Sequence, residues 1–138
     1  MNRCMISLRE QERLFTLRVA AVIVHGDYVL LQRLELDDFW FMPGGRCEIG
    51  EPTAHALRRE MQEEMGRDVR VERLLWVLEQ FFSWQGTDHH ELCFFYLVDP
   101  GPEFVFDPDT PFYGQEQELK LVFRWFPVDA LEAVSYTH

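Results

Sequence analysis

The segment from Gly45 to Arg67 constrains this chain more than any other part, because its residues GRCEIGEPTAHALRREMQEEMGR combine a glycine pair with an acidic helix. Pro52 suits the first turn of a helix and Gly66 suits its end, so the helix is expected between them. Apolar residues recur inside it at intervals of three and four, at Ala54, Leu57, Met61 and Met65. This stripe predicts that one side of the helix packs on a sheet.

Three carboxylates of the same helix fall on a neighbouring side. Glu60, Glu63 and Glu64 are spaced i, i+3 and i+4, and like charges at this spacing destabilise a helix unless a positive group lies between them. A hard divalent cation with oxygen ligands would resolve the repulsion, and Mg²⁺ is the usual choice where a phosphate is also bound. An ordinary solvated acidic face is the alternative interpretation, since charge runs on helices are common.

The spacing of the surrounding residues favours the metal site over the solvated face. The chain follows the pattern G-x5-E-x7-R-E-U-x-E-E-x-G-U, in which U is a bulky apolar residue, from Gly45 through Glu51, Arg59, Glu60, Met61, Glu63 and Glu64 to Gly66. In this it resembles the Nudix hydrolases (MutT-like), although no subgroup is identified. Arg67 occupies the last apolar position, and we expect Val69 to take over its packing role.

The resemblance assigns roles to the acidic residues of the helix. It implies that Glu60, Glu63 and Glu64 bind Mg²⁺, with Mn²⁺ as an alternative ion, and that together with Arg59 they are the catalytic residues. The backbone carbonyl of a loop glycine, Gly44 or Gly45, commonly joins such a set, and Gly45 is our candidate ligand. Glycine there permits close approach of the backbone.

Three residues of the pattern have positioning or structural roles by the same resemblance. Arg59 is expected to pair with one of the glutamates and to hold its orientation, although a plain surface arginine is the alternative. Glu51 is expected to form hydrogen bonds close to the glycine loop and the start of the helix, where a negative charge stabilises the helix. Gly66 ends the helix.

The general base is less constrained, because in this family it comes from the pattern itself or from a glutamate elsewhere. Glu116 and Glu118 are candidates for the base or for an extra metal ligand, and Glu91 is a third candidate for the base. Each of them taken alone fits a solvated carboxylate better than a base. Trp84 and His89 are candidate substrate contacts, since a nucleobase needs an aromatic platform and a few polar groups. His89 and His90 should point apart in an extended chain, which makes them a poor metal pair.

Composition limits the class of protein. The 138 residues are predicted to form a single domain over residues 1–138, and 47% of them are hydrophobic. The longest aliphatic run, Val19 to Val24, is too short to cross a bilayer, and the N-terminus lacks the apolar stretch of a secretory signal. We therefore expect a cytoplasmic protein without a membrane partner. The ending at Tyr136-Thr137-His138 suggests that a natural C-terminal segment is missing.

Charge and cysteines exclude further classes. The net charge of −11 would repel a polyphosphate backbone, so extended nucleic acid is not an expected partner, whereas a small anionic nucleotide bound through a cation is compatible with it. Cys4, Cys47 and Cys93 are odd in number and lack metal-ligand spacing, which indicates reduced thiols. Cys47 lies at a variable position of the pattern, where no base is placed beside it to make it a nucleophile.

The rest of the chain alternates strands and turns. A β-hairpin is predicted over Arg18–Val24 and Tyr28–Arg33, followed by a short strand at 39–42 and the glycine loop. Val69–Phe82 is predicted as a central strand because it is apolar on both faces, and 83–88 as a turn. Leu92–Val98 and Leu121–Phe126 are further strands, separated by a loop over 99–114, and a short helix is expected at 128–134. This order fits an α/β protein with a mixed sheet sandwiched between α-helices, the Nudix fold that the resemblance implies.

Function follows as an expectation from the resemblance. The chain would be a Mg²⁺-dependent hydrolase that attacks a phosphoanhydride bond with water, in a nucleoside diphosphate linked to another group. A nucleoside triphosphate or a modified nucleotide is the default substrate, because Phe82 and Ser83 replace the proline associated with ADP-ribose hydrolysis and Trp84 replaces the tyrosine of dinucleoside polyphosphate hydrolases. The alternative is a catalytically silent nucleotide sensor, and a homodimer is one assembly left open.

Overall fold

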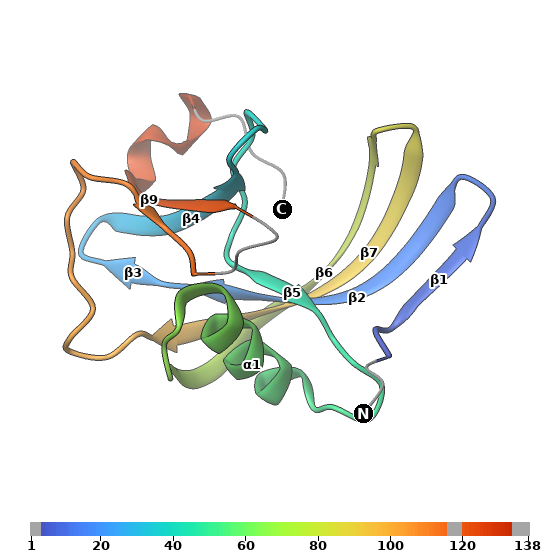
Figure 1. Ribbon diagram of the computed structural model, residues 1–138, viewed down its shortest axis with the longest axis horizontal. Coiled ribbons are helices and arrows are strands. Elements are labelled where there is room, and N and C mark those ends of the chain that lie inside the picture. Colours follow the sequence, from blue (N-terminus) through green and yellow to red (C-terminus); the bar gives the residue numbers. More distant parts are fainter. Residues whose placement is uncertain (1–3, 116–119, 134–138) are drawn as a thin grey trace.

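The strands of the chain form two sheets in a computed structural model that describes residues 4–115 and 120–133 (Figure 1). The first sheet has the order β1 (Ser7–Glu10), β2 (Arg13–Val22), β7 (Thr87–Asp99) and β6 (Arg70–Trp84), and β5 (Gly44–Arg46) also pairs with β2. The second sheet has the order β3 (Val24–His25), β4 (Tyr28–Leu34), β9 (Leu121–Pro127) and β8 (Phe112–Tyr113). Two helical segments complete the described chain: the α-helix α1 (Thr53–Met65) and the 3-10 helix η1 (Val128–Ala133).

The first sheet is mixed, because β2 and β7 run parallel while its other pairs are antiparallel. The parallel register places Thr16 beside Glu91 and Arg18 beside Cys93, which brings together residues more than seventy positions apart in the sequence. A mixed sheet with an accompanying helix confirms the predicted α/β class. The helix expected near residue 128 is present as the 3-10 helix η1.

The main core lies where α1 meets the first sheet. Its fully buried members include Val19 and Ala21 on alternate positions of β2, Ile23 directly after that strand, and Ala56, Leu57 and Met61 on α1. Ala56 therefore takes the inner position that the sequence had suggested for Ala54. Val69 is 4% exposed in the same core, which confirms its predicted packing role. Arg67 instead places its guanidinium over the Phe104 ring, 5.2 Å from the centroid.

The predicted first hairpin is correct in its turn and wrong in its first strand. Gly26 has a φ of 57°, which suits the turn, and Val24 and His25 pair with Val29 and Tyr28. The residues before them belong to β2, which ends at Val22 and lies in the first sheet. An unbroken β-branched run conceals this change of sheet, because each local segment still has strand-like character.

The glycine segment and the short strand predicted before it exchange their roles. Within 39–42 the backbone forms isolated bridges at Trp40 and Phe41, the second of them to Gln32, and no strand, so the predicted strand there is wrong. Gly44 to Arg46, predicted as a loop, forms β5 and pairs with β2 through Gly44–Ala20 and Gly45–Val19. Glycine has weak strand propensity, and tertiary contact overrides it here.

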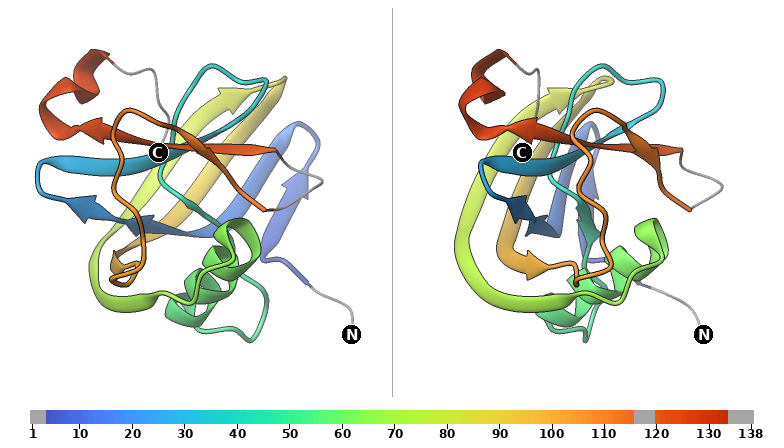
Figure 2. Two further views of the ribbon diagram at one scale, coloured as in Figure 1. Left: turned by 60° about the vertical axis from the view of Figure 1, so that its left-hand side comes forward. Right: turned by 90° about the vertical axis from the view of Figure 1, so that its left-hand side faces the viewer.

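β6 lies at an edge of the first sheet and not at its centre, as Figure 2 shows in both views. Leu74, Trp76, Val77 and Leu78 are each 40–44% exposed. The prediction of a central strand was wrong because an apolar run indicates strand character without identifying its neighbours. The turn that follows is also shorter than predicted, since β6 continues to Trp84 and β7 begins at Thr87.

No helix in the described ranges is long and apolar enough to cross a bilayer. Figure 1 shows the β6–β7 and β1–β2 hairpins extending away from the second sheet, with α1 below β5. A cavity opens between these hairpins, the segment that follows β4, and the carboxylate side of α1.

Candidate active site

The helix that carries the candidate carboxylates is bounded as its sequence predicts. Pro52 has a φ of −59° and a ψ of 145°, outside the helical region, and the helix begins at the next residue. Gly66 has a φ of 68°, the left-handed conformation that glycine adopts without strain, and its N–H donates to the Gln62 carbonyl. Gln115 adds a second cap, because its backbone N–H donates to the Glu64 carbonyl over 2.9 Å. The helix is therefore fixed at both ends.

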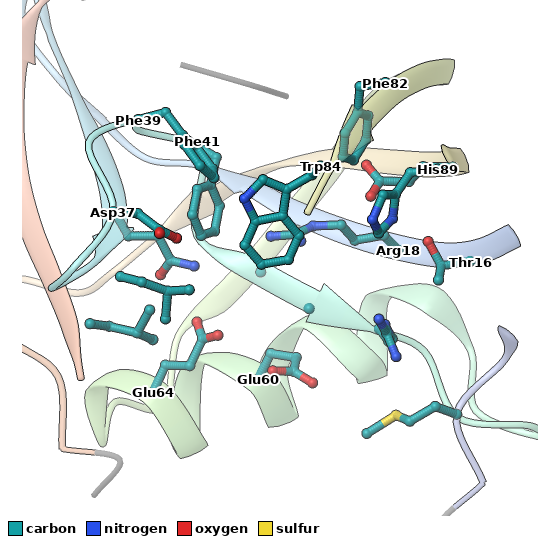
Figure 3. A pocket seen from close by; sticks show the side chains of 18 of the residues that line it. Thr16, Arg18, Asp37, Phe39, Phe41, Glu60, Glu64, Phe82, Trp84 and His89 are labelled. Atoms are coloured by element: carbon teal, nitrogen blue, oxygen red, sulfur yellow. The ribbon is translucent and has the colours of Figure 1, made fainter. Parts of the chain in front are cut away.

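The acidic side of α1 is partly buried and faces the cavity. Glu60 and Glu64 are 7% and 6% exposed, and together with Glu63 they line the cavity. Figure 3 shows Glu60 and Glu64 pointing from α1 into this space. The alternative of a fully solvated acidic face is therefore wrong for Glu60 and Glu64, because both side chains are buried. Carboxylates are seldom buried unless they are paired.

Two glycines bring the backbone of β5 close to its neighbours. A Cβ atom on Gly44 would collide with the backbone of Val19, and one on Gly45 would collide with the Glu60 carboxylate. The second contact means that the backbone of Gly45 approaches the side chain of the first candidate metal ligand directly. Only glycine fits at position 44, whereas a Cβ at position 45 would require the Glu60 carboxylate to move.

Arg59 organises the carboxylates around itself. Its Nε and Nη2 donate to the two oxygens of Glu51 over 2.8 and 3.0 Å, and its Nη1 donates to Glu60 over 2.8 Å and to Glu63 over 3.3 Å. Glu48 forms a further ion pair with Nε at 2.8 Å. The guanidinium is the planar donor set that such multidentate contacts need. Arg59 is therefore a positioning residue in the geometry of this site.

Burial and pairing shift the ionisation of this network in opposite directions. Burial raises the pKa of Glu60, and the hydrogen bond from Arg59 opposes that change without cancelling it. The hydrogen bond from Arg59 lowers the pKa of Glu51. Burial by itself would lower the pKa of Arg59, but its hydrogen bonds to Glu51 and Glu60 raise it further than burial lowers it. The guanidinium stays charged, and Glu51 is held as a carboxylate.

The donor set fits a hard divalent cation. The carboxyl groups of Glu60, Glu63 and Glu64 line the cavity together with Gly45, and Mg²⁺ prefers one or two carboxylates with several waters over a complete protein cage. Among the described residues no group of three acidic, histidine or cysteine side chains already converges as a metal-ligand set. The contacts explain this, because Arg59 binds both Glu60 and Glu63. A metal ion would compete with Arg59 for Glu63.

The two candidate bases, Glu116 and Glu118, lie outside the described residues. Gln115, immediately before them, donates from its Nε2 to the Gln62 carbonyl over 2.8 Å. The chain thus approaches the C-terminal end of α1 at this point. The prediction of a solvated carboxylate is wrong for Glu91, because its side chain is 6% exposed and lines the cavity.

The cavity has a volume of about 770 Å³ and an aromatic part opposite α1. Its rings come from Phe39 and Phe41 in the segment after β4, and from Phe82, Trp84 and His89 in the β6–β7 hairpin. Figure 3 shows these side chains above Glu60 and Glu64. His89 stacks on Phe82 at a centroid distance of 4.8 Å, and burial lowers its pKa, so it is neutral near pH 7.

His90 points away from the cavity, as alternation along a strand predicts. It stacks on the exposed Phe81 with centroids 4.4 Å apart and contacts Glu79 at 2.9 Å. The structure therefore brings Trp84 and His89 to the same cavity as the acidic helix, and leaves His90 outside it.

The cavity also has a polar part that the sequence did not predict. It includes Thr16, Arg18 and Gln32. Arg18 places its guanidinium 5.2 Å from the centroid of the Phe41 ring. A signal for it existed, since a single arginine interrupts the apolar stretch from Leu17 to Val24 at a position where strands are buried. The aromatic walls at Phe39 and Phe41 were missed because their segment was interpreted as a strand.

Cys47 has none of the features of a nucleophile. Its side chain is fully buried, and burial raises the pKa of its thiol to about 11. Cys93 is likewise buried, with a pKa of about 12. Both thiols are protonated and inert near neutral pH, as expected for structural cysteines.

Comparison with known proteins identifies the family model called NUDIX domain, which matches residues 14–137. An RNA pyrophosphohydrolase from Campylobacter jejuni is 32% identical over 119 residues, 82% of this chain and 65% of that protein. An 8-oxo-dGTP diphosphatase from Haemophilus influenzae is 32% identical over 123 residues, which are 85% of this chain and 80% of that protein. The solved structure of a NUDIX hydrolase from Nitrosomonas europaea is similar, with a TM-score of 0.60 and 27% sequence identity. The match covers 86% of this chain and 76% of that one. The chain spans only 21–65% of the length of several curated relatives.

Proposed function

Because the chain belongs to the Nudix family, we propose that it is a Mg²⁺-dependent hydrolase of a phosphoanhydride bond in a nucleoside diphosphate linked to another group. One observation carries this proposal: the acidic side of α1 and the aromatic rings of the β6–β7 hairpin line the same cavity. The first can hold phosphates through a cation, and the second can hold a planar base.

The proposed metal ligands are Glu60, Glu63 and Glu64, with the carbonyl of Gly44 or Gly45. Bound Mg²⁺, or Mn²⁺ as an alternative, would neutralise phosphate oxygens and lower the pKa of a coordinated water. The protein's own part is mostly positioning, as is general for phosphoryl chemistry. Arg59 holds Glu60 and Glu51 in place, and with the three glutamates it completes the proposed catalytic set. Glu116 and Glu118 remain our candidates for the base.

Arg18 adds a positive charge to the cavity between the two functional parts. Its charge acts on Glu60, a residue of the acidic helix, and on Glu91 of β7. A guanidinium at this position is suited to a phosphate oxygen, because arginine binds phosphates with parallel hydrogen bonds. We propose that it contacts the phosphate chain of the substrate.

A nucleoside triphosphate or a modified nucleotide is the substrate that we propose. The cavity is large enough for a nucleotide, and Trp84 and His89 offer stacking surfaces for its base. The Haemophilus influenzae relative acts on 8-oxo-dGTP by its name, which supports this choice. The Campylobacter jejuni relative acts on RNA by its name, but the net charge of −11 disfavours long nucleic acid here.

We propose the remaining properties on the same grounds. Residues 1–138 form a single Nudix domain, the partner is a small-molecule nucleotide, and the protein acts in the cytoplasm without a membrane partner. A homodimer is one assembly left open for this protein, and light scattering distinguishes it from a monomer. The alternative function, a nucleotide sensor without turnover, would be expected if the acidic residues of the pattern were lost, and all of them are present.

Hydrolysis assays test the proposal. The purified protein is incubated with dGTP, 8-oxo-dGTP, ADP-ribose, a dinucleoside polyphosphate and 5′-triphosphorylated RNA, with Mg²⁺ or with EDTA. We expect release of nucleoside monophosphate or phosphate only with Mg²⁺, and loss of most turnover in Glu63→Gln and Glu64→Gln. Glu79→Gln is the matched control, because Glu79 is exposed on β6 outside the cavity.

Two results would contradict it. Binding of a nucleotide without any turnover would favour the sensor. Equal activity in the wild type, Glu63→Gln and Glu64→Gln would refute the metal ligands themselves.

A further inference from the structure

Glu91 is a buried carboxyl group on the wall of the cavity. It lies on β7 beside Thr16 of β2, on the same face as Cys93 and Phe95, and it is 6% exposed. Glutamate is seldom buried to this degree in a strand, because desolvation of a carboxylate is costly unless a partner compensates it. The burial of Glu91 in the cavity wall therefore indicates a functional role for its carboxyl group.

Hydrogen-bond acceptors without donors gather around the cavity. Within the described ranges, Gln32 Oε1 and Asp37 Oδ2 are buried without a hydrogen-bond partner, and the buried Glu91 carboxyl group shares the cavity with them. All three groups line this cavity, and Gln32 is 1% exposed. Buried polar atoms are normally satisfied, so this concentration of acceptors points to a ligand that brings donors.

Two arginines limit the effect of burial on Glu91. Burial raises the pKa of Glu91 overall, and the guanidinium groups of Arg18 and Arg46 oppose that rise without cancelling it. Arg18 is itself held over the Phe41 ring, and its charge also acts on Glu60. A ligand that reaches Arg18 with its phosphates can therefore place its base near Glu91, among the aromatic side chains.

The hydrogen-bonding pattern of a carboxylate indicates which nucleobase can bind beside Glu91. Two carboxylate oxygens accept two parallel N–H groups, and guanine presents such a pair at N1 and at its 2-amino group. Hypoxanthine lacks the 2-amino group, and adenine offers one donor beside an acceptor. We propose that Glu91 is the specificity-determining residue of the cavity and selects guanine-type bases by accepting these two hydrogen bonds. This inference rests on the proposed function, since it concerns the base of the same nucleotide.

Binding of nucleoside monophosphates in EDTA, measured by calorimetry, tests the inference without turnover. We expect the wild type to bind GMP about 10- to 100-fold more tightly than IMP or AMP, as one bidentate pair to a base discriminates by about 1–3 kcal/mol. Glu91→Gln should abolish the difference between GMP and IMP and shift preference toward AMP, because an amide pairs with one donor and one acceptor. Glu79→Gln, with the same change of charge on the exposed face of β6, should retain the wild-type order.

The outcomes separate this inference from the proposed function. Mg²⁺-dependent hydrolysis with an unchanged GMP-to-AMP ratio in Glu91→Gln would overturn the inference and leave the function intact. An equal fall in kcat on every nucleotide, with binding unaffected, would make Glu91 part of the reaction and would also overturn it. Absence of hydrolysis with Glu91-dependent GMP binding would instead refute the function alone. If Glu91→Gln fails to fold, Glu91→Met provides the same test, and a wild type without preference for GMP overturns the inference directly.

Discussion

Removal of Arg59 tests whether the carboxylate network depends on one cation. The side chain is 20% exposed and contacts Glu48, Glu51 and Glu60 at 2.8 Å each, and Glu63 at 3.3 Å. Replacement by methionine keeps most of the apolar stem and leaves four carboxylates without their shared partner. Breaking a buried ion pair from one side costs roughly 3–5 kcal/mol, and we expect Arg59→Met to lose stability in this range at pH 7 without metal.

The expected loss depends on pH. The hydrogen bond from Arg59 lowers the pKa of Glu51 below its ordinary value of 4.5. A group whose pKa is depressed in the folded state adds stability above its unfolded pKa, and this stability disappears as pH falls through the folded pKa. The difference between Arg59→Met and wild type should therefore be largest near neutral pH and should shrink below about pH 4.5.

Urea unfolding followed by tryptophan fluorescence measures both effects, provided that the m-value is unchanged. Arg58→Met is the matched control, because Arg58 is 51% exposed and forms a surface pair with Asp68 at 3.0 Å, which predicts a loss below about 1 kcal/mol. Arg59→Lys should lie between the two, since lysine keeps the charge without the planar fork. A loss below about 1 kcal/mol for Arg59→Met, or one independent of pH, would refute the reasoning.

Three further predictions follow from contacts of single residues. Gly45→Ala should reduce Mg²⁺-dependent turnover more than stability, since a Cβ there displaces the Glu60 carboxylate; unchanged turnover would refute the close approach. Gly44→Ala should destabilise the fold in urea, because its Cβ meets the backbone of β2 instead of a movable side chain; a wild-type unfolding midpoint would contradict this. In a thiol titration of the native protein at pH 8, only Cys4 should react quickly, because Cys47 and Cys93 are buried with pKa values of about 11 and 12; fast labelling of all three would refute their burial.

The helix and its boundaries could be predicted from sequence because they depend on neighbours within a few positions. Pro52 and Gly66 set the ends, and the spacing of Glu60, Glu63 and Glu64 places them on one side whatever surrounds them. The packing of Val69 in place of Arg67 was also predictable, since Val69 is the first apolar residue after Gly66.

The burial of these carboxylates and the position of β6 could not be predicted in the same way. An apolar run such as Leu74 to Leu78 indicates a strand, but its place at an edge depends on which strands pair, and pairing joins distant residues. The glycine segment is similar, because β5 exists only where β2 accepts it.

The sequence by itself determined the family and the identity of the acidic helix, because the residues of the pattern lie within one continuous segment. Only the tertiary structure decided the composition of the cavity. The parallel register of β2 and β7 places Thr16 beside Glu91 and brings Arg18 to the same wall, and the β6–β7 hairpin adds Trp84 and His89. No local rule encodes this register, since the side-chain contacts that fix it form only when the sheet is assembled.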